Sequence, residues 1–168
     1  MPGQVIGTSL HRGYPGTFSR QNILLSLARV AGAAIPFGAP VQYNSSGNVV
    51  PMDATGTAAK FLGIASREVK QALSYDAAVF GQYNPKDMAT IISQGAVSVV
   101  CNVGTPTVNG SVYLRVKANE AIEDGVVGGL EAAADSTNTV ELTNVRWTSD
   151  GKDENNVAEI RILYPVNA

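Results

Sequence analysis

The sequence is poor in the residues that build catalytic and metal centres. Its 168 residues include one cysteine, Cys101, one histidine, His11, and one tryptophan, Trp147. A single cysteine excludes an intramolecular disulfide framework and a cysteine-rich metal site. One histidine and one distant cysteine do not make the usual ligand shell of a transition metal. We therefore expect no metal and no other cofactor.

Charge is also scarce. Charged residues make up 15% of the chain, against about a quarter in an ordinary globular domain. The 12 Lys and Arg and the 14 Asp and Glu give a net charge of −2. They form no dense basic stripe, which argues against direct contact with nucleic acid. So few charges favour a protein whose surfaces end against other protein, since a freely solvated domain usually carries more.

Long apolar runs are missing as well. No run approaches the roughly 18 apolar residues that a membrane-spanning helix needs. The first residues, Met-Pro-Gly-Gln, lack the charged and apolar regions of a signal peptide. We therefore expect a chain that is made in the cytoplasm and has no membrane partner.

Short apolar segments separated by turn residues fill most of the chain. Two hairpins are predicted, one over 39–52 with its turn at 44–47 and one over 88–103 with its turn at Gln94-Gly95. Residues 110–117 form the clearest half-buried strand, because apolar and polar residues alternate there. Its apolar side comprises Val112, Leu114 and Val116, and its polar side Ser111, Tyr113, Arg115 and Lys117.

Further strands are predicted over four segments, 60–70, 126–133, 139–148 and 157–165. Residues 23–34 favour a strand, with a helix as the alternative, and residues 71–78 form a short helix or a loop. Strands at intervals of roughly 8–15 residues are typical of an all-β fold. The sequence therefore predicts an antiparallel β-barrel or sandwich, jelly-roll-like, as the core domain over 23–168.

The first 22 residues differ from this core. Glycine and proline are frequent there, which disfavours a long helix or strand, and Arg12 and Arg20 are present without any acid. Apolar residues are nevertheless spaced along the segment, which is unusual for a disordered tail. We expect an extended N-terminal arm over 1–22 that lies either on a partner or on its own domain. Its apolar residues are Val5, Ile6, Leu10, Tyr14 and Phe18.

Each residue that is suited to chemistry has a structural interpretation. His11 lies in the arm, where a general base is poorly anchored. Cys101 lies in an apolar strand and is expected to be a buried, inert thiol. Residues 150–154 lack the spacing of a calcium loop and indicate a solvated acidic loop. The glycines of 125–129 match no phosphate-binding motif and indicate a bulge or a close backbone approach. We therefore expect a protein that is not an enzyme.

Several segments, in their order along the chain, resemble the structural cement proteins of tailed bacteriophages. They are MPGQ at 1–4, HRGYPGTFSR at 11–20, IPFGAPV at 35–41, TGTAAKFLGIA at 55–65, GAVSVVCNV at 95–103 and GSVYLRV at 110–116. The resemblance spans essentially the whole chain, although residues 23–34 are richer in Ala and Leu than is usual for the family. It implies a β-rich decoration protein that is assembled in the bacterial host cytoplasm and lies on the outer surface of the phage head. Such a protein binds the major capsid protein and locks neighbouring subunits together.

This resemblance suggests a role for the arm. An extended segment spreads its contacts over a long reach, so we expect capsid binding through Arg12, Tyr14, Phe18 and Arg20. Association with itself is also expected, with a homotrimer favoured over a homodimer. The alternative is a carbohydrate-binding or host-adhesion module on the virion surface, which the single tryptophan disfavours. A hydrolase is a third hypothesis.

Overall fold

The computed structural model describes residues 12–68 and 81–166. It is 44% strand and 4% helical, and its antiparallel sheet curls into a half-barrel, which confirms the predicted all-β class. The predicted segment 71–78 lies outside the described residues, as does His11. The elements are β1 (Phe18–Val30), β2 (Ile35–Pro36), β3 (Pro40–Tyr43), β4 (Val49–Pro51), η1 (Ala58–Lys60), β5 (Gly63–Ala65), β6 (Gln82–Tyr83), β7 (Met88–Val100), β8 (Ser111–Arg115), β9 (Leu130–Glu131), η2 (Ser136–Asn138), β10 (Thr139–Trp147) and β11 (Val157–Ile162).

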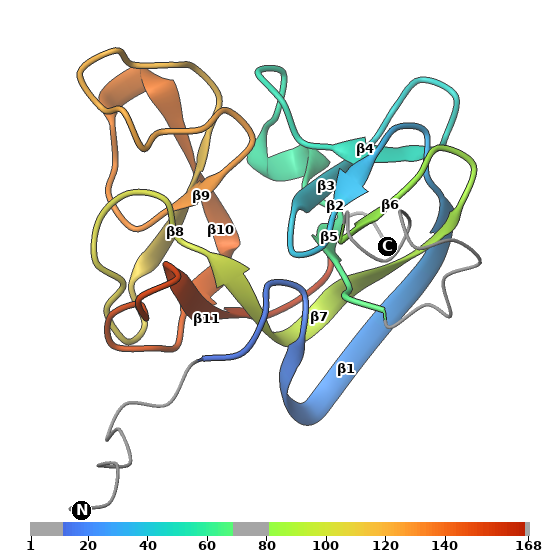
Figure 1. Cartoon of the computed structure of the whole chain (residues 1–168), viewed down its shortest axis with the longest axis horizontal. Coiled ribbons are helices and arrows are strands. Elements are labelled where there is room, and N and C mark those ends of the chain that lie inside the picture. The colour runs from blue at the N-terminus through green and yellow to red at the C-terminus, as the bar shows by residue number, and fades with distance from the viewer. Residues whose placement is uncertain (1–11, 69–80, 167–168) are drawn as a thin grey trace, which may run out of the picture.

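Strand β7 organises the sheet (Figure 1). It pairs with β1 along one edge, and with β5 and then β11 along the other. The main sheet has the order β4-β3-β5-β7-β11-β10-β8-β9, with β1 added on β7, while β2 and β6 form a separate pair. Every pairing of named strands is antiparallel. The sheet therefore holds two lobes together through one long strand.

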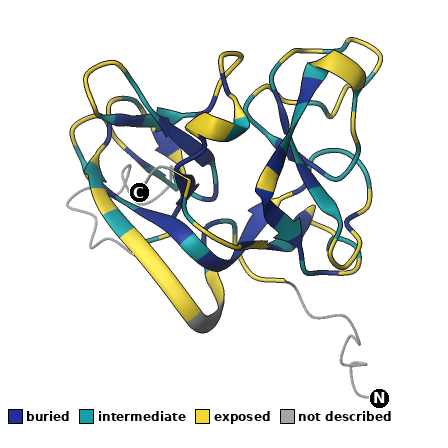
Figure 2. Ribbon diagram, turned by 180° about the vertical axis from the view of Figure 1, so that it is seen from behind, coloured by how far each residue is buried: buried dark blue, intermediate teal, exposed yellow. Residues whose placement is uncertain are grey.

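Two apolar clusters fill these lobes. One is built mainly on β7, β8, β10 and β11 and includes Trp147, and the other is built on β1 to β7 and includes Tyr83. Ile92 belongs to the first cluster and Ile91 to the second, because successive side chains of a strand point to opposite faces. Figure 2 shows these buried interiors, with β1 largely exposed along one border of the molecule.

The hairpin predicted over 39–52 is confirmed. Strands β3 and β4 pair antiparallel, and the Asn44 side-chain oxygen accepts the N–H groups of Ser46 (2.9 Å) and Asn48 (3.0 Å) in the turn. Strands over 23–34 and 110–117 are also confirmed, as β1 and β8. β1 begins at Phe18, so its first residues fall within the segment 1–22 that was expected to be an arm.

The hairpin predicted over 88–103 is wrong, because β7 continues through Gly95 without turning. Gly95 has a φ of +121°, and a Cβ there would lie 2.8 Å from the carbonyl oxygen of Ile23 on β1. The pairing register of β1 with β7 shifts at this point. Glycine therefore accommodates a bulge of the neighbouring strand at this position, and it does not form a hairpin turn.

Buried Tyr83 makes one lobe sensitive to alkali. Its hydroxyl donates a hydrogen bond to the carbonyl oxygen of Ser66 (2.7 Å). Burial raises the pKa of Tyr83 from 10.0 to about 12. The neutral phenol therefore contributes stability that is fully present below pH 10 and is lost as the pH rises towards 12.

We expect the free energy of unfolding to fall between these two pH values, by on the order of 2–3 kcal/mol from Tyr83 alone. Urea titrations at fixed pH measure this slope. The variant Tyr83→Phe should lose part of it, whereas Tyr164→Phe, at a site that is 52% exposed, should keep it. An unchanged slope in Tyr83→Phe would contradict the role assigned to this phenol.

Candidate functional site

Residues 12–17, here called the N-terminal segment, are hydrogen-bonded to their own domain. The N–H of Arg12 donates to an Asp153 carboxylate oxygen (2.9 Å), and the Ser98 hydroxyl donates to the carbonyl oxygen of Arg12 (2.9 Å). The N–H of Gly16 donates to the carbonyl oxygen of Ser98 (2.7 Å). The described part of the expected arm therefore lies on the body of the protein, along β7.

Two glycines permit this close contact. Gly16 and Gly38 have φ values of +82° and +80°. A Cβ on Gly16 would lie 2.8 Å from the N atom of Gly38, and a Cβ on Gly38 would lie 2.5 Å from the Cβ of Pro15. A larger residue at either position would displace the N-terminal segment from the domain.

Three of the four residues expected to bind the capsid align with one short stretch of β7. Phe18 pairs with Val97 and Arg20 with Ala96. Arg12 is bound to the next residue along the strand, Ser98, and its guanidinium also donates to the carbonyl oxygen of Asp150 (2.6 Å). Strand β7 therefore brings Arg12 and Arg20, the first and last of these residues, close together along the chain of β7.

The two aromatic members of the set are exposed although their main chain is fixed. Tyr14 is 65% exposed and Phe18 is 38% exposed. The guanidinium carbon of Arg67 lies 4.4 Å from the centre of the Tyr14 ring, which is within the range of a cation–π contact. Both rings are thus available to a partner from a rigid support.

A second exposed apolar feature lies on β1. Ile23, Leu24 and Leu25, here called the β1 apolar stretch, are 57%, 38% and 39% exposed. Three consecutive apolar residues in a strand cannot all face one side, and this is the sequence signal that could have revealed the exposure. Arg29 follows on the same strand and donates to the neutral oxygens of Tyr43 (2.8 Å) and Ala28 (2.9 Å).

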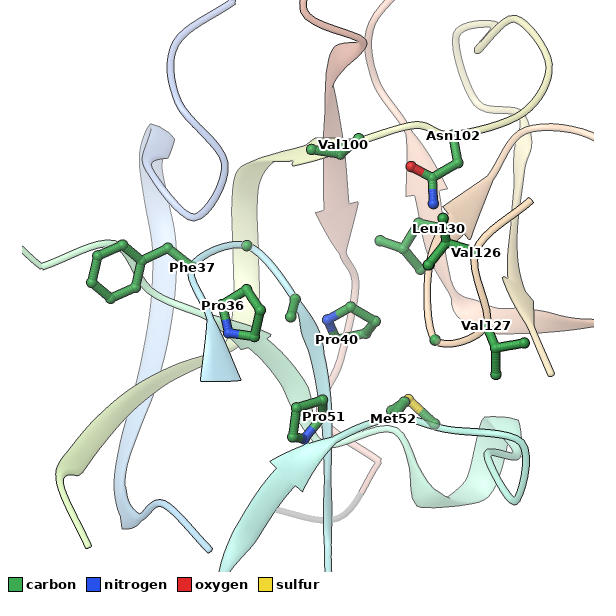
Figure 3. Close-up of a pocket in the computed structure, with 14 residues that line it drawn as sticks. Pro36, Phe37, Pro40, Pro51, Met52, Val100, Asn102, Val126, Val127 and Leu130 are labelled. Atoms are coloured by element: carbon green, nitrogen blue, oxygen red, sulfur yellow. The ribbon is translucent and has the colours of Figure 1, made fainter. Parts of the chain in front are cut away.

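An apolar pocket of about 260 Å³ lies between the two lobes (Figure 3). Small-molecule sites usually start near 300 Å³, so this pocket suits side chains of a protein partner better than a cofactor. Sequence reasoning did not find it, because its walls come from four separate parts of the chain. They are Pro36, Phe37, Gly38, Ala39 and Pro40; Pro51 and Met52; Val100 and Asn102; and Val126, Val127, Gly128, Gly129 and Leu130.

The connection from β8 to β9 forms one rim of this pocket. Its residues Glu120, Glu123 and Asp124 are exposed, and Val126 and Val127 are 58% and 38% exposed. We call residues 120–127 the acidic loop. It carries these acids in the same connection that contributes Val126 and Val127 to the pocket wall.

The glycines that follow the acidic loop approach other backbone closely, as their sequence pattern indicated. Gly128 has a φ of +83°, and a Cβ there would lie 2.3 Å from the carbonyl oxygen of Met52. The N–H of Gly128 donates to the carbonyl oxygen of Arg115 (2.8 Å), and the N–H of Arg115 donates to that of Gly129 (3.0 Å). The loop is therefore fixed to β8 and to the opposite wall of the pocket.

A buried ionic network supports the same loop. Arg115, predicted on the polar side of its strand, is instead completely buried, because its guanidinium is paired with Glu131 on β9. It also donates to a carboxylate oxygen of Asp135 (2.9 Å). A hydrogen bond from Asn119 (3.0 Å) and the one from Arg115 lower the pKa of Asp135 below its usual value. The network ties both ends of the connection to the sheet.

Most of the residues that were considered as catalytic or metal-binding candidates have a structural role. Cys101 is a fully buried free thiol, and burial raises the pKa of that thiol. Asp153 accepts the N–H groups of Asn155 (3.0 Å) and Val157 (2.8 Å) within its own loop. Over 12–68 and 81–166, no three His, Cys, Asp or Glu residues gather in a way that could hold a metal ion. In the same ranges, no helix has the length and apolar character to cross a membrane.

Comparison with known proteins identifies the family. The family model described as "XM1 gp53 minor capsid protein" matches residues 3–162. Among solved structures, a chain of "The capsid of Myoviridae Phage XM1" is similar in fold, with a TM-score of 0.66, 16% sequence identity and 94% of each chain covered. No curated protein matches the chain. Because the family model matches nearly the whole chain, the protein belongs to the XM1 gp53 minor capsid protein family and is a capsid-associated structural protein of the phage virion.

Proposed function

We propose that this protein is a head cement protein that binds the outer surface of the major capsid protein shell and bridges neighbouring capsomers. The observation that carries the proposal is the pair of exposed aromatic side chains, Tyr14 and Phe18, on a main chain that is fixed to the domain. A pre-ordered surface loses little conformational freedom on binding. Arg12, which is exposed, adds positive charge to this surface.

The proposed role is structural, and the protein acts as a homotrimer. Three copies joined together engage several shell subunits at once, so modest contacts combine through effective concentration. The alternative, a carbohydrate-binding module, would need an exposed aromatic platform. The single tryptophan, Trp147, is completely buried in the core, which disfavours that alternative.

The test is the decoration of purified heads that lack this protein. The double variant Tyr14→Ser/Phe18→Ser should bind such heads on the order of a hundredfold more weakly, because burying two aromatic side chains against the shell contributes about 3 kcal/mol or more. Occupancy is measured by gel densitometry and by cryo-electron microscopy. A deletion of residues 2–20 is less suitable, since it removes the start of β1 and the contacts to Ser98.

The matched control is Val108→Ser, an apolar residue that is 66% exposed and lies outside the N-terminal segment and β1. It should decorate heads like the unmodified chain. Unfolding curves for all variants show whether the domain is intact. Full occupancy by the folded double variant would refute the proposed binding surface. Binding should also weaken as salt is raised, because exposed charge pairs are screened.

A further inference from the structure

Two exposed surfaces of this chain are both apolar and carry opposite charge. The β1 apolar stretch is exposed on one lobe and is followed by Arg29, which donates hydrogen bonds to the neutral oxygens of Tyr43 and Ala28. The pocket wall includes Val126 and Val127, and the acidic loop to which they belong also carries Glu120, Glu123 and Asp124, which are exposed. Within the described parts of the chain, none of these three acids forms an ion pair. One surface is an apolar stretch of strand followed by an arginine, and the other is an apolar recess whose adjoining loop carries three acids.

Within one chain, both surfaces remain exposed to solvent. The β1 apolar stretch remains 38–57% exposed, and Val126 and Val127 remain 58% and 38% exposed. In Figure 1 the acidic loop belongs to the lobe of β8 and β9, whereas β1 borders the other lobe. Complementary surfaces at separate places on one molecule lead to head-to-tail contacts between copies.

We propose that the β1 apolar stretch of one copy enters the pocket of the next copy, with the acidic loop facing Arg29. The proposal rests on the self-association in the proposed function and names the interface that produces it. A pocket of about 260 Å³ is larger than the roughly 150 Å³ cavity that holds a benzene molecule. It therefore has room for aliphatic side chains of the β1 apolar stretch. Burying each of these contributes about 1.5–3 kcal/mol of transfer free energy in a site already shaped for it.

Charge favours this pairing over direct pairing of two β1 strands. The first acid in the sequence is Asp53, so the segment that contains β1 carries only arginines. Direct contact between two β1 strands would bring together two segments that hold Arg29 and no acid. Like charges directly opposite each other destabilise paired strands. Contact between β1 and the acidic loop instead places opposite charges together, which also guides the orientation of docking.

Disulfide cross-linking of purified protein in the absence of heads tests the interface. Two variants are prepared with tags of different size, Leu24→Cys and Val127→Cys, both at sites that are 38% exposed. Cys101 needs no replacement because it is completely buried. Under mild oxidation the mixture should form a disulfide between the two different chains. Leu24→Cys alone should form little dimer, and so should its mixture with Val108→Cys.

Complementation gives a second measurement. Leu24→Asp and Val127→Asp should each be monomeric by sedimentation velocity, where the unmodified chain is oligomeric. Mixed together they should form a one-to-one dimer, since one chain keeps an intact β1 and the other an intact pocket. A mixture that stays monomeric would overturn the head-to-tail contact. Efficient cross-linking of Leu24→Cys to itself or to Val108→Cys would do the same.

These results are distinguishable from failure of the proposed function. If cross-linking succeeds but heads are not decorated, the interface stands and the cement role falls. If Leu24→Cys cross-links only to the major capsid protein on heads, the β1 apolar stretch binds the shell. In that case the interface between copies falls while the cement role stands.

Discussion

Replacing Arg115 with alanine is expected to lower the free energy of unfolding by about 3–5 kcal/mol, because it leaves a buried charge without its partner. Glu131 is fully buried, and Arg115 donates two hydrogen bonds to its carboxylate. The same guanidinium donates to Asp135 (2.9 Å) and to the carbonyl oxygen of Lys117 (3.2 Å). Total stabilities of single domains are about 5–15 kcal/mol, so this loss is a large share of the total. Urea unfolding at neutral pH measures it.

The control for Arg115 is Arg146→Ala. Arg146 pairs with Glu141 at 3.3 Å, and these side chains are 30% and 40% exposed. Exposed pairs contribute about 0–1 kcal/mol, so this variant should unfold almost like the unmodified chain. Equal losses in the two variants would contradict the role of the buried network.

The network also predicts a response to acid. The pKa of Asp135 is lowered from 3.8 by hydrogen bonds from Asn119 and then Arg115. Its ionised form therefore contributes stability that is present above pH 3.8 and is lost as the pH falls through the lowered value. In Arg115→Ala this part of the acid response should shrink, because one of the groups that lower the pKa is removed.

Replacing Gly63 with alanine is the second large effect, with an expected loss of about 3 kcal/mol or more, at the upper end for single substitutions. Gly63 has a φ of +156°, and a Cβ there would lie 2.1 Å from the carbonyl oxygen of Ile92. That oxygen belongs to the main chain of β7, at its pairing with β5. The strand cannot move without breaking contacts in both lobes, so the clash disrupts the pairing of β5.

The control for Gly63 is Gly47→Ala in the turn between β3 and β4. Gly47 has a φ of +76°, but nothing lies within 4 Å of the added Cβ. It should lose only the left-handed backbone penalty of about 1–2 kcal/mol. Thermal and urea unfolding of the two variants separate the clash from the backbone strain. Similar losses would show that the contact with Ile92 is readily relieved.

Local patterns predicted those parts of the fold that local chemistry determines. The turn at 44–48 is stabilised by an Asn side chain within the turn itself, and the strand at 111–115 follows the alternation of its apolar residues. Both features are contained in a few consecutive residues. The all-β class followed from many such short segments taken together.

Features that depend on distant partners were not predictable in this way. Gly95 has the composition of a turn, but its conformation is determined by Ile23 on the neighbouring strand. Arg115 alternates like a surface residue, but its burial depends on Glu131, which lies 16 residues further along the chain. The pocket draws its walls from four segments that only the curled sheet brings together. The pattern of charge and hydropathy along the chain does not show which distant residues contact one another.

The passage of one strand through both lobes has a mechanical consequence. β7 extends over 13 residues, about 40 Å at the usual rise of a strand. It is hydrogen-bonded to β1 along one edge and to β5 and β11 along the other. Tension that pulls the lobes apart along β7 therefore loads many parallel bonds in shear, and no single bond yields first. A molecule built in this way transmits strain across its length while keeping its shape.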